Sequence, residues 1–239
     1  MRDHSLLNAW AAAHTALLVE GQSRLCDVIG TDYPAWEMAP DQGLLTLHNS
    51  RVQYALLGRV DEETNAWIWA WADREFDAYS LAVQRTWPLR QFGMENGLWE
   101  FVEPTFPMEG VVDLGMTPGA TLAMVASPQI MGGAIFSGFW PSGRAYMVVT
   151  DPRLTMEEAS LYTATKHISG GVAYGLGHHR DIVTVYAAAH HLEVWGSGDL
   201  LTLVFPDANR LEVHFDAKDR ILRMHGVVAR LDTPGPGPA

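Results

Sequence analysis

The sequence predicts an α+β fold in which antiparallel meanders and hairpins pack against several helices, with a tryptophan-rich strand at the centre. Three observations predict this class. Strand-like runs are joined by short polar turns, stretches with apolar residues at helical spacing lie between them, and there is no regular βαβ alternation. With 239 residues, of which 48% are hydrophobic and 18% charged, the chain is long and apolar enough to bury a sizeable core.

The N-terminal part predicts one long helix followed by a meander. Asp3 or Ser5 can cap the helix, apolar residues then recur at helical spacing, and Gly30 ends it. The first two strands are joined by Asn49-Ser50, a two-residue hairpin signal, and a polar turn leads to the third. The three predicted strands are 44–48, 52–59 and 66–72.

Proline and glycine punctuate the middle of the chain. A helix that begins near Ser80 meets Pro88, which must kink or end it because proline removes a donor and clashes with the preceding turn. The uncharged stretch 114–143 is long enough to span a membrane, but its prolines and glycines favour a short helix and a buried strand. The predicted segments are an extended connection at 98–107, a helix at 120–126, a break at Ser127-Pro128, and a hairpin of strands 134–140 and 144–150.

The C-terminal part predicts two helices followed by a second meander. The spacing of Thr155 and Glu158 is that of a capping box, which would start a helix that runs through about Gly170. The further segments are an amphipathic helix at 181–195, strands at 200–205, 211–215 and 221–231, and a disordered tail at 233–239. We expect residues 1–232 to form one continuous domain, because the one possible boundary, at 151–155, is short and has no flexible linker.

Charge and cysteine content exclude several classes. Sixteen basic and 28 acidic residues give a net charge of −12, which argues against a nucleic-acid-binding protein and against docking on an anionic membrane. The single cysteine, Cys26, cannot form an intrachain disulfide, so nothing indicates an oxidising compartment. Asp3 and His4 interrupt any apolar region after Arg2, so no signal peptide is predicted, and a cytoplasmic location is expected.

The most distinctive run is a strand with three tryptophans. Trp67, Trp69 and Trp71 are two residues apart, so in a strand they share one face, while Ile68 and Ala70 lie on the other. The tryptophan face is either a core layer or an aromatic platform for a ligand or partner, since tryptophan combines a large rigid surface with one polar N–H. Both interpretations stay open at this point.

The run WIWAWAD at 67–73 also carries a family resemblance. Together with the helix around 13–17 and the hairpin at 133–150, it resembles a family of bacterial domains of unknown function whose members have a W-[IL]-W-A-W-A strand. The resemblance covers about residues 4–152 and implies a single small α+β domain. It implies no activity and transfers no catalytic residue.

Histidines supply the candidate catalytic residues. His178 and His179 follow a glycine-rich segment, and with Arg180 and Asp181 they could provide a base, an anion clamp and an orienting carboxylate. Asp181 equally fits a helix N-cap in a solvent-facing loop. His14 lies in the apolar stripe of the first helix, either as a core histidine bonded to a backbone carbonyl or as an acid/base residue at a pocket floor. No dinucleotide, phosphate-loop, HExxH or GxSxG motif is present.

We predict no metal site and no cofactor, although His178, His179, His190 and His191 invite the idea. On one helix, His179 and His190 would lie about 16 Å apart along the axis, whereas a zinc ion needs its nitrogen ligands about 2 Å away. Neighbouring residues on a helix also diverge by about 100°, so neither histidine pair chelates easily.

These observations favour an intracellular binding protein of bacterial type. It would recognise a protein partner or a small-molecule ligand through the surface of Trp67, Trp69 and Trp71, with its oligomeric state left open. Bacterial immunity-type proteins share this profile of small, acidic, motif-free α+β domains, an analogy that concerns the profile alone. The alternative is a small-molecule enzyme that uses His178 and His179 in acid/base chemistry. Whether these histidines converge in a cleft separates the two hypotheses.

Overall fold

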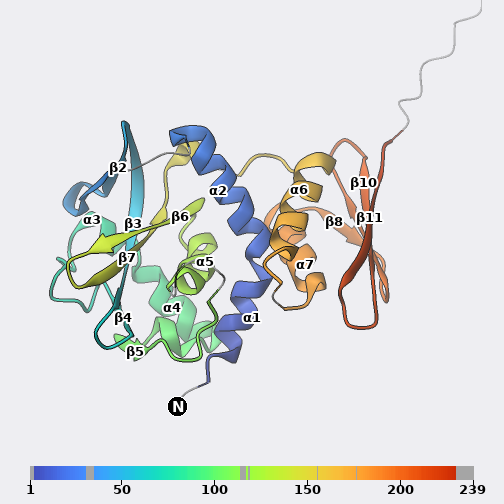
Figure 1. Cartoon of the computed structure of the whole chain (residues 1–239). Helices are drawn as coiled ribbons and strands as arrows, with labels where there is room; N and C mark the ends of the chain where they lie inside the picture. Colours follow the sequence, from blue (N-terminus) through green and yellow to red (C-terminus); the bar gives the residue numbers. More distant parts are fainter. Residues whose placement is uncertain are drawn as a thin grey trace, which may run out of the picture.

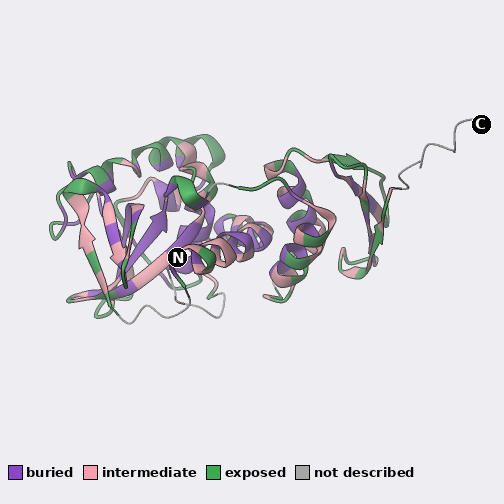
Figure 2. Cartoon of the chain, turned by 90° about the horizontal axis from the view of Figure 1, so that it is seen from above, coloured by how far each residue is buried: buried purple, intermediate pink, exposed green. Residues whose placement is uncertain are grey.

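The protein forms two lobes that meet along a bent N-terminal pair of helices (Figure 1). The computed structural model describes residues 3–30, 35–113, 117, 119–154, 156–175 and 177–229. We call residues 3–154 the N-terminal lobe and residues 156–229 the C-terminal lobe. Figure 2 shows that the buried residues of both lobes concentrate where helices and strands face one another.

Seven strands of the described chain form the sheet of the N-terminal lobe, all paired antiparallel. They are β1 (Trp36–Ala39), β2 (Leu44–Leu47), β3 (Ser50–Asp61), β4 (Ala66–Trp69), β5 (Thr105–Pro107), β6 (Ala134–Trp140) and β7 (Gly143–Val149). The long strand β3 organises the sheet, because it pairs with β2, β4 and β7. Both predicted hairpins are confirmed, as is the α+β class. The first turn lies one residue earlier than expected, since Ser50 already pairs with Leu47.

The N-terminal helices differ from the single helix that the apolar spacing predicts. The chain forms α1 (Ser5–Ala13) and α2 (Thr15–Ile29), with a break at His14. At this break two side chains compete with backbone N–H groups for the carbonyl oxygens that a continuous helix would use. His14 Nδ1 lies 2.7 Å from the Trp10 carbonyl oxygen, and Thr15 Oγ1 donates to the Ala12 carbonyl oxygen. Figure 1 shows α2 continuing at an angle to α1.

Three further helices complete the N-terminal lobe: α3 (Leu81–Gln84), α4 (Trp87–Asn96) and α5 (Ala120–Gln129). The helix predicted to begin near Ser80 ends at Gln84, before Pro88, as expected. Pro88 lies in the first turn of the next helix, α4, where its missing N–H is tolerated. Within 98–107 only β5 is extended, and Trp99–Phe101 form a 3-10 turn. Helix α5 runs through Pro128, so the expected break at Ser127 is wrong. Its residues 120–126 are all buried, which explains why they are apolar on every side.

The C-terminal lobe packs two helices on one face of a four-stranded antiparallel sheet. Its elements are α6 (Leu161–Val172), α7 (His179–Ala189), β8 (Glu193–Trp195), β9 (Leu200–Val204), β10 (Arg210–Phe215) and β11 (Ile221–Val227), and the strand order is β11-β10-β9-β8. The predicted final meander is confirmed. The helix expected at 181–195 ends at Ala189, because residues 193–195 pair with β9 as an edge strand.

The capping box of α6 is not the one that the sequence pattern indicates. Helix α6 begins at Leu161, where Ser160 Oγ accepts from the Thr163 N–H and Thr163 Oγ1 accepts from the Ser160 N–H. Glu158 therefore lies before the helix, and Thr155 lies outside the described residues. The tail 233–239 also lies outside them, and the expectation of one continuous domain stays a prediction.

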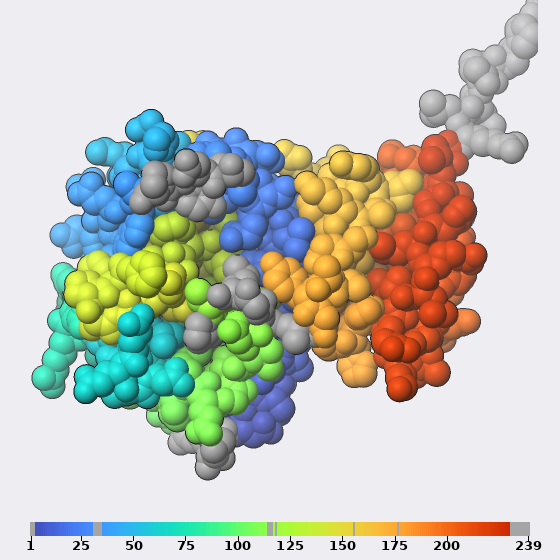
Figure 3. Space-filling model, viewed as in Figure 1, coloured from blue at the N-terminus to red at the C-terminus, as the bar shows by residue number. Residues whose placement is uncertain are grey.

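Close contact between α2 and α6 joins the lobes. A Cβ atom on Gly171 would lie 2.6 Å from the Ala16 backbone nitrogen, and one on Gly170 would lie 2.9 Å from a methyl group of Val19. The glycines thus let the two helices approach more closely than side chains allow. Figure 3 shows the orange helices of the C-terminal lobe lying against the blue N-terminal helices, with the red sheet farthest away. No helix in the described part of the chain is long and apolar enough to cross a membrane.

Candidate functional site

The tryptophan row lies inside the N-terminal lobe. Trp67 and Trp69 have no exposed surface, and their rings are packed edge to face with centroids 5.2 Å apart. Helices α1 and α5 cover them, since residues of both belong to the same hydrophobic cluster. Strand β4 ends at Trp69, so Trp71 is not part of the strand and is only half buried. The structure therefore places two of the three proposed binding residues in the core.

The segment around His178 is tied to the C-terminal sheet. His179 Nδ1 accepts from the Ile221 N–H at 3.0 Å, and Arg180 Nε donates to Asp219 at 2.6 Å. The Arg180 guanidinium also lies 4.2 Å above the ring centre of Phe215. Burial lowers the pKa of His179. These contacts fix the start of α7 to the hairpin of β10 and β11.

The other three candidates do not complete a catalytic arrangement with His179. His178 is the exposed N-cap residue of α7, and Asp181 lies exposed in its first turn. The N-cap position expected for Asp181 is thus held by His178. His14 is buried, its Nδ1 bonds to the Trp10 carbonyl, and its ring stacks on the Trp10 indole with centroids 5.7 Å apart. Burial also lowers the pKa of His14.

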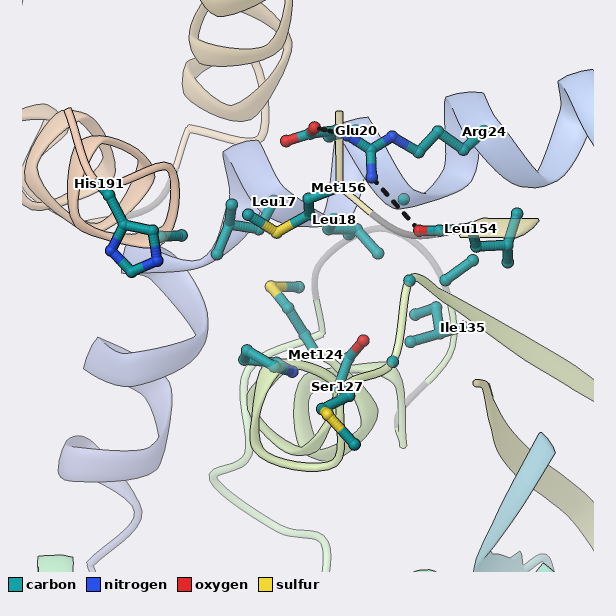
Figure 4. Close-up of a pocket in the computed structure, with 17 residues that line it drawn as sticks. Leu17, Leu18, Glu20, Arg24, Met124, Ser127, Ile135, Leu154, Met156 and His191 are labelled. Carbon is teal, nitrogen blue, oxygen red and sulfur yellow. Dashed lines mark hydrogen bonds and ion pairs between the residues drawn. The ribbon is translucent and has the colours of Figure 1, made fainter. Parts of the chain in front are cut away.

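A cavity of about 520 Å³ lies where the two lobes meet (Figure 4). None of the five candidate catalytic residues, the four at 178–181 and His14, is among the described residues that line it. The lining is mostly apolar and comes from α2, α5, the start of β6, the segment after β7 and the end of α7: Leu17, Leu18, Met124, Pro128, Met131, Ile135, Leu154, Met156 and Ala189. Its polar side chains are Glu20, Arg24, Ser127 and His191.

Close backbone approach shapes the floor of this cavity. A Cβ atom on Gly21 would lie 1.4 Å from the Gly133 carbonyl oxygen, so only glycine lets α2 lie against the start of β6. A Cβ atom on Gly132 would likewise lie 2.0 Å from a methyl group of Val148. The cavity therefore lies beside a close contact between α2 and the start of β6.

One polar wall of the cavity centres on Glu20, which is 3% exposed. Its Oε1 pairs with Arg24, one turn further along α2, and its Oε2 accepts from His190 Nε2 at 2.8 Å. Arg24 also donates to the Leu154 carbonyl at 3.3 Å, as Figure 4 shows. Both carboxylate oxygens thus have a partner, one from each lobe.

Two further side chains of the C-terminal lobe lie behind Glu20. His167 Nδ1 is 3.9 Å from Glu20 Oε2 and 3.4 Å from the Tyr186 hydroxyl. Burial lowers the pKa of His167, although the Glu20 carboxylate acts in the opposite direction. Burial raises the pKa of Tyr186, so its hydroxyl stays protonated. The cluster joins α2, α6 and α7 through one buried carboxylate.

The mouth of the cavity carries flexible side chains. Met131 is 92% exposed and Met156 is 47% exposed, and Met124 lies further in. Methionine adapts its shape through three rotatable bonds and makes favourable contacts with many apolar surfaces. Such a mouth can admit apolar molecules of different shapes. In the described part of the chain, no group of three histidine, cysteine, aspartate or glutamate side chains is placed to hold a metal ion.

Sequence reasoning missed the Glu20 cluster, although a signal for it exists. Glu20 lies among Leu17, Leu18, Gly21 and Leu25 in the apolar stretch of α2, where a carboxylate is unexpected. Its histidine partners come from α6 and α7, far away in the sequence, and no local spacing indicates that they meet.

A family described as a family of unknown function (DUF6882) matches residues 8–152. This match confirms the resemblance to a domain family of unknown function, and it ends where the N-terminal lobe ends. Comparisons with curated proteins and with solved structures gave no match. The C-terminal lobe, which supplies Met156, Ala189 and His191 to the cavity, lies outside the matched residues.

Proposed function

The chain belongs to the DUF6882 family, whose function is unknown, and from its interlobe cavity we propose that it binds a small, largely apolar molecule. The observation that carries the proposal is the combination of size and lining. Pockets for small ligands commonly measure about 300–1,000 Å³, lie between domains, and carry a few polar groups in an apolar wall. The cavity between these lobes has all three properties.

The placement of the other candidates supports the same proposal. Trp67 and Trp69 are buried, so they offer no aromatic surface to a protein partner. His179 and Arg180 are engaged with the C-terminal sheet, and neither is among the described residues that line the interlobe cavity. The ligand-binding form of the hypothesis is therefore favoured over both the protein-binding form and the histidine enzyme.

Filling the cavity is expected to weaken binding. Ala189, at the end of α7, lines the cavity and is half buried, so Ala189→Trp places an indole where the ligand would lie. The fluorescence of aminoanthracene, which rises in apolar surroundings, measures binding. We expect Ala189→Trp to weaken binding by about tenfold or more, a loss of about 1.4 kcal/mol.

The matched control is Ala188→Trp on the same helix. Ala188 is exposed, so the added indole points to solvent and should leave the affinity for aminoanthracene unchanged. Equal affinities of wild type and Ala189→Trp would contradict the proposal, as would the absence of any fluorescence increase with the wild-type protein. Circular dichroism of both variants checks that they are folded to the same extent.

A further inference from the structure

We propose that the ligand is an amphipathic carboxylate whose head group binds Arg24 and whose chain fills the apolar part of the cavity. This inference rests on the proposed function and adds the chemical class of the ligand. It starts from the charges around the cavity. Among the described residues that line it, Glu20 is the one carboxylate and Arg24 the one guanidinium, and His191 lies at the end of α7 (Figure 4).

Several hydrogen-bond donors surround the one carboxylate of this wall, Glu20, although the whole chain has a net charge of −12. His167 and His190 both face Glu20 from the C-terminal lobe, and Lys166 Nζ donates to Ser23 on the same helix as Arg24. Donors that are not used up by the Glu20 carboxylate favour a ligand that brings a hydrogen-bond acceptor.

Arg24 has the geometry to receive such a group. A guanidinium carries five N–H donors, and the contacts among the described residues use one donor toward Glu20 and one toward the Leu154 carbonyl. Its planar fork matches a carboxylate in a paired arrangement of two hydrogen bonds. Arg24 lies at the cavity wall, so a ligand head group can reach it without disturbing the core.

Glu20 keeps a partner when Arg24 turns to the ligand. Its Oε2 accepts from His190 Nε2 at 2.8 Å, so the buried carboxylate is held from the C-terminal lobe as well. An amine is the opposite case. It would compete with Arg24 and His190 for a carboxylate whose two oxygens already have donors, and it would meet the positive charge of Arg24.

Three probes of equal chain length separate these cases in isothermal titration: decanoate, decanol and decylamine. We expect decanoate to bind about tenfold more tightly than decanol, a difference of about 1.4 kcal/mol, and decylamine to bind most weakly. Arg24→Met, which keeps an apolar stem, should lower the ratio of decanoate affinity to decanol affinity from about tenfold to about one. Arg74→Met, at an exposed position away from the cavity, should leave all three affinities unchanged.

The outcomes distinguish the two proposals. Equal binding of decanoate and decanol, both blocked by Ala189→Trp, would overturn the carboxylate inference and leave the proposed function standing. No binding of any probe would overturn both. A preference for decanoate that survives in Arg24→Met would also overturn the inference. If Arg24→Met is poorly folded, Arg24→Lys keeps the charge but lacks the planar pair of N–H donors, and it should lower the ratio of decanoate affinity to decanol affinity.

Discussion

Trp69→Ala is expected to lower the free energy of unfolding by about 3–5 kcal/mol, as full truncation of a buried aromatic side chain does. The Trp69 ring has no exposed surface, and its centroid lies 5.2 Å from those of Trp67 and Phe101. Its indole N–H also donates to the Glu100 carbonyl at 2.7 Å, so the truncation leaves a buried acceptor without its donor. Urea denaturation followed by circular dichroism measures the loss.

Trp195→Ala is the matched control for this experiment. Trp195 is 44% exposed in the edge strand β8 and stacks with the Arg210 guanidinium 5.1 Å from its ring. A stacked cation at an exposed ring contributes about 0.5–1 kcal/mol, so Trp195→Ala should cost far less than Trp69→Ala. Equal losses for the two variants would contradict the placement of Trp69 in the core.

Glu20→Ala is expected to lower the free energy of unfolding by about 3 kcal/mol, because removing one partner of a buried ion pair leaves the other charge uncompensated. Glu20 holds Arg24 within α2 and His190 across the lobe contact, and the side chain is 4% exposed. We also expect faster amide hydrogen exchange in α7, since this helix loses its bond to α2.

An exposed ion pair supplies the control for Glu20. Arg220 pairs with Asp216 at 2.6 Å, and its side chain is 63% exposed. Pairs of this kind contribute about 0–1 kcal/mol, so Arg220→Ala should change stability little. If Glu20→Ala costs no more than Arg220→Ala, the Glu20 cluster does not hold the lobes together.

The parts of the fold that the sequence predicts well are those that local chemistry decides. The hairpin of β6 and β7 follows from the turn residues at 141–143, and the end of α3 follows from Pro88. Helix boundaries set by competing side chains are harder to predict. The break at His14 depends on bonds from its own ring and from Thr15 to carbonyls that an uninterrupted helix would use.

The site could not be predicted because its residues meet only in the folded chain. The spacing of the tryptophans shows correctly that Trp67 and Trp69 share a face, but not that α1 and α5 cover that face. The glycine-rich segment before His178 matches no ligand-binding motif, and its role too is decided by the fold. In the structure Gly171 is a contact surface for α2, and a Cβ atom on Gly177 would lie 2.8 Å from Ala12. Both features serve the packing of helices.

Methionine methyl groups provide the most direct test that the interlobe cavity is a ligand site. The chain has ten methionines, and Met124, Met131 and Met156 line the cavity, whereas Met94 and Met147 do not. In a protein labelled with ¹³C at the methionine methyl groups, titration with decanol is expected to shift the resonances of these three methionines and to leave those of Met94 and Met147 in place. No shift at the three cavity methionines, or shifts confined to Met94, would contradict the proposed site.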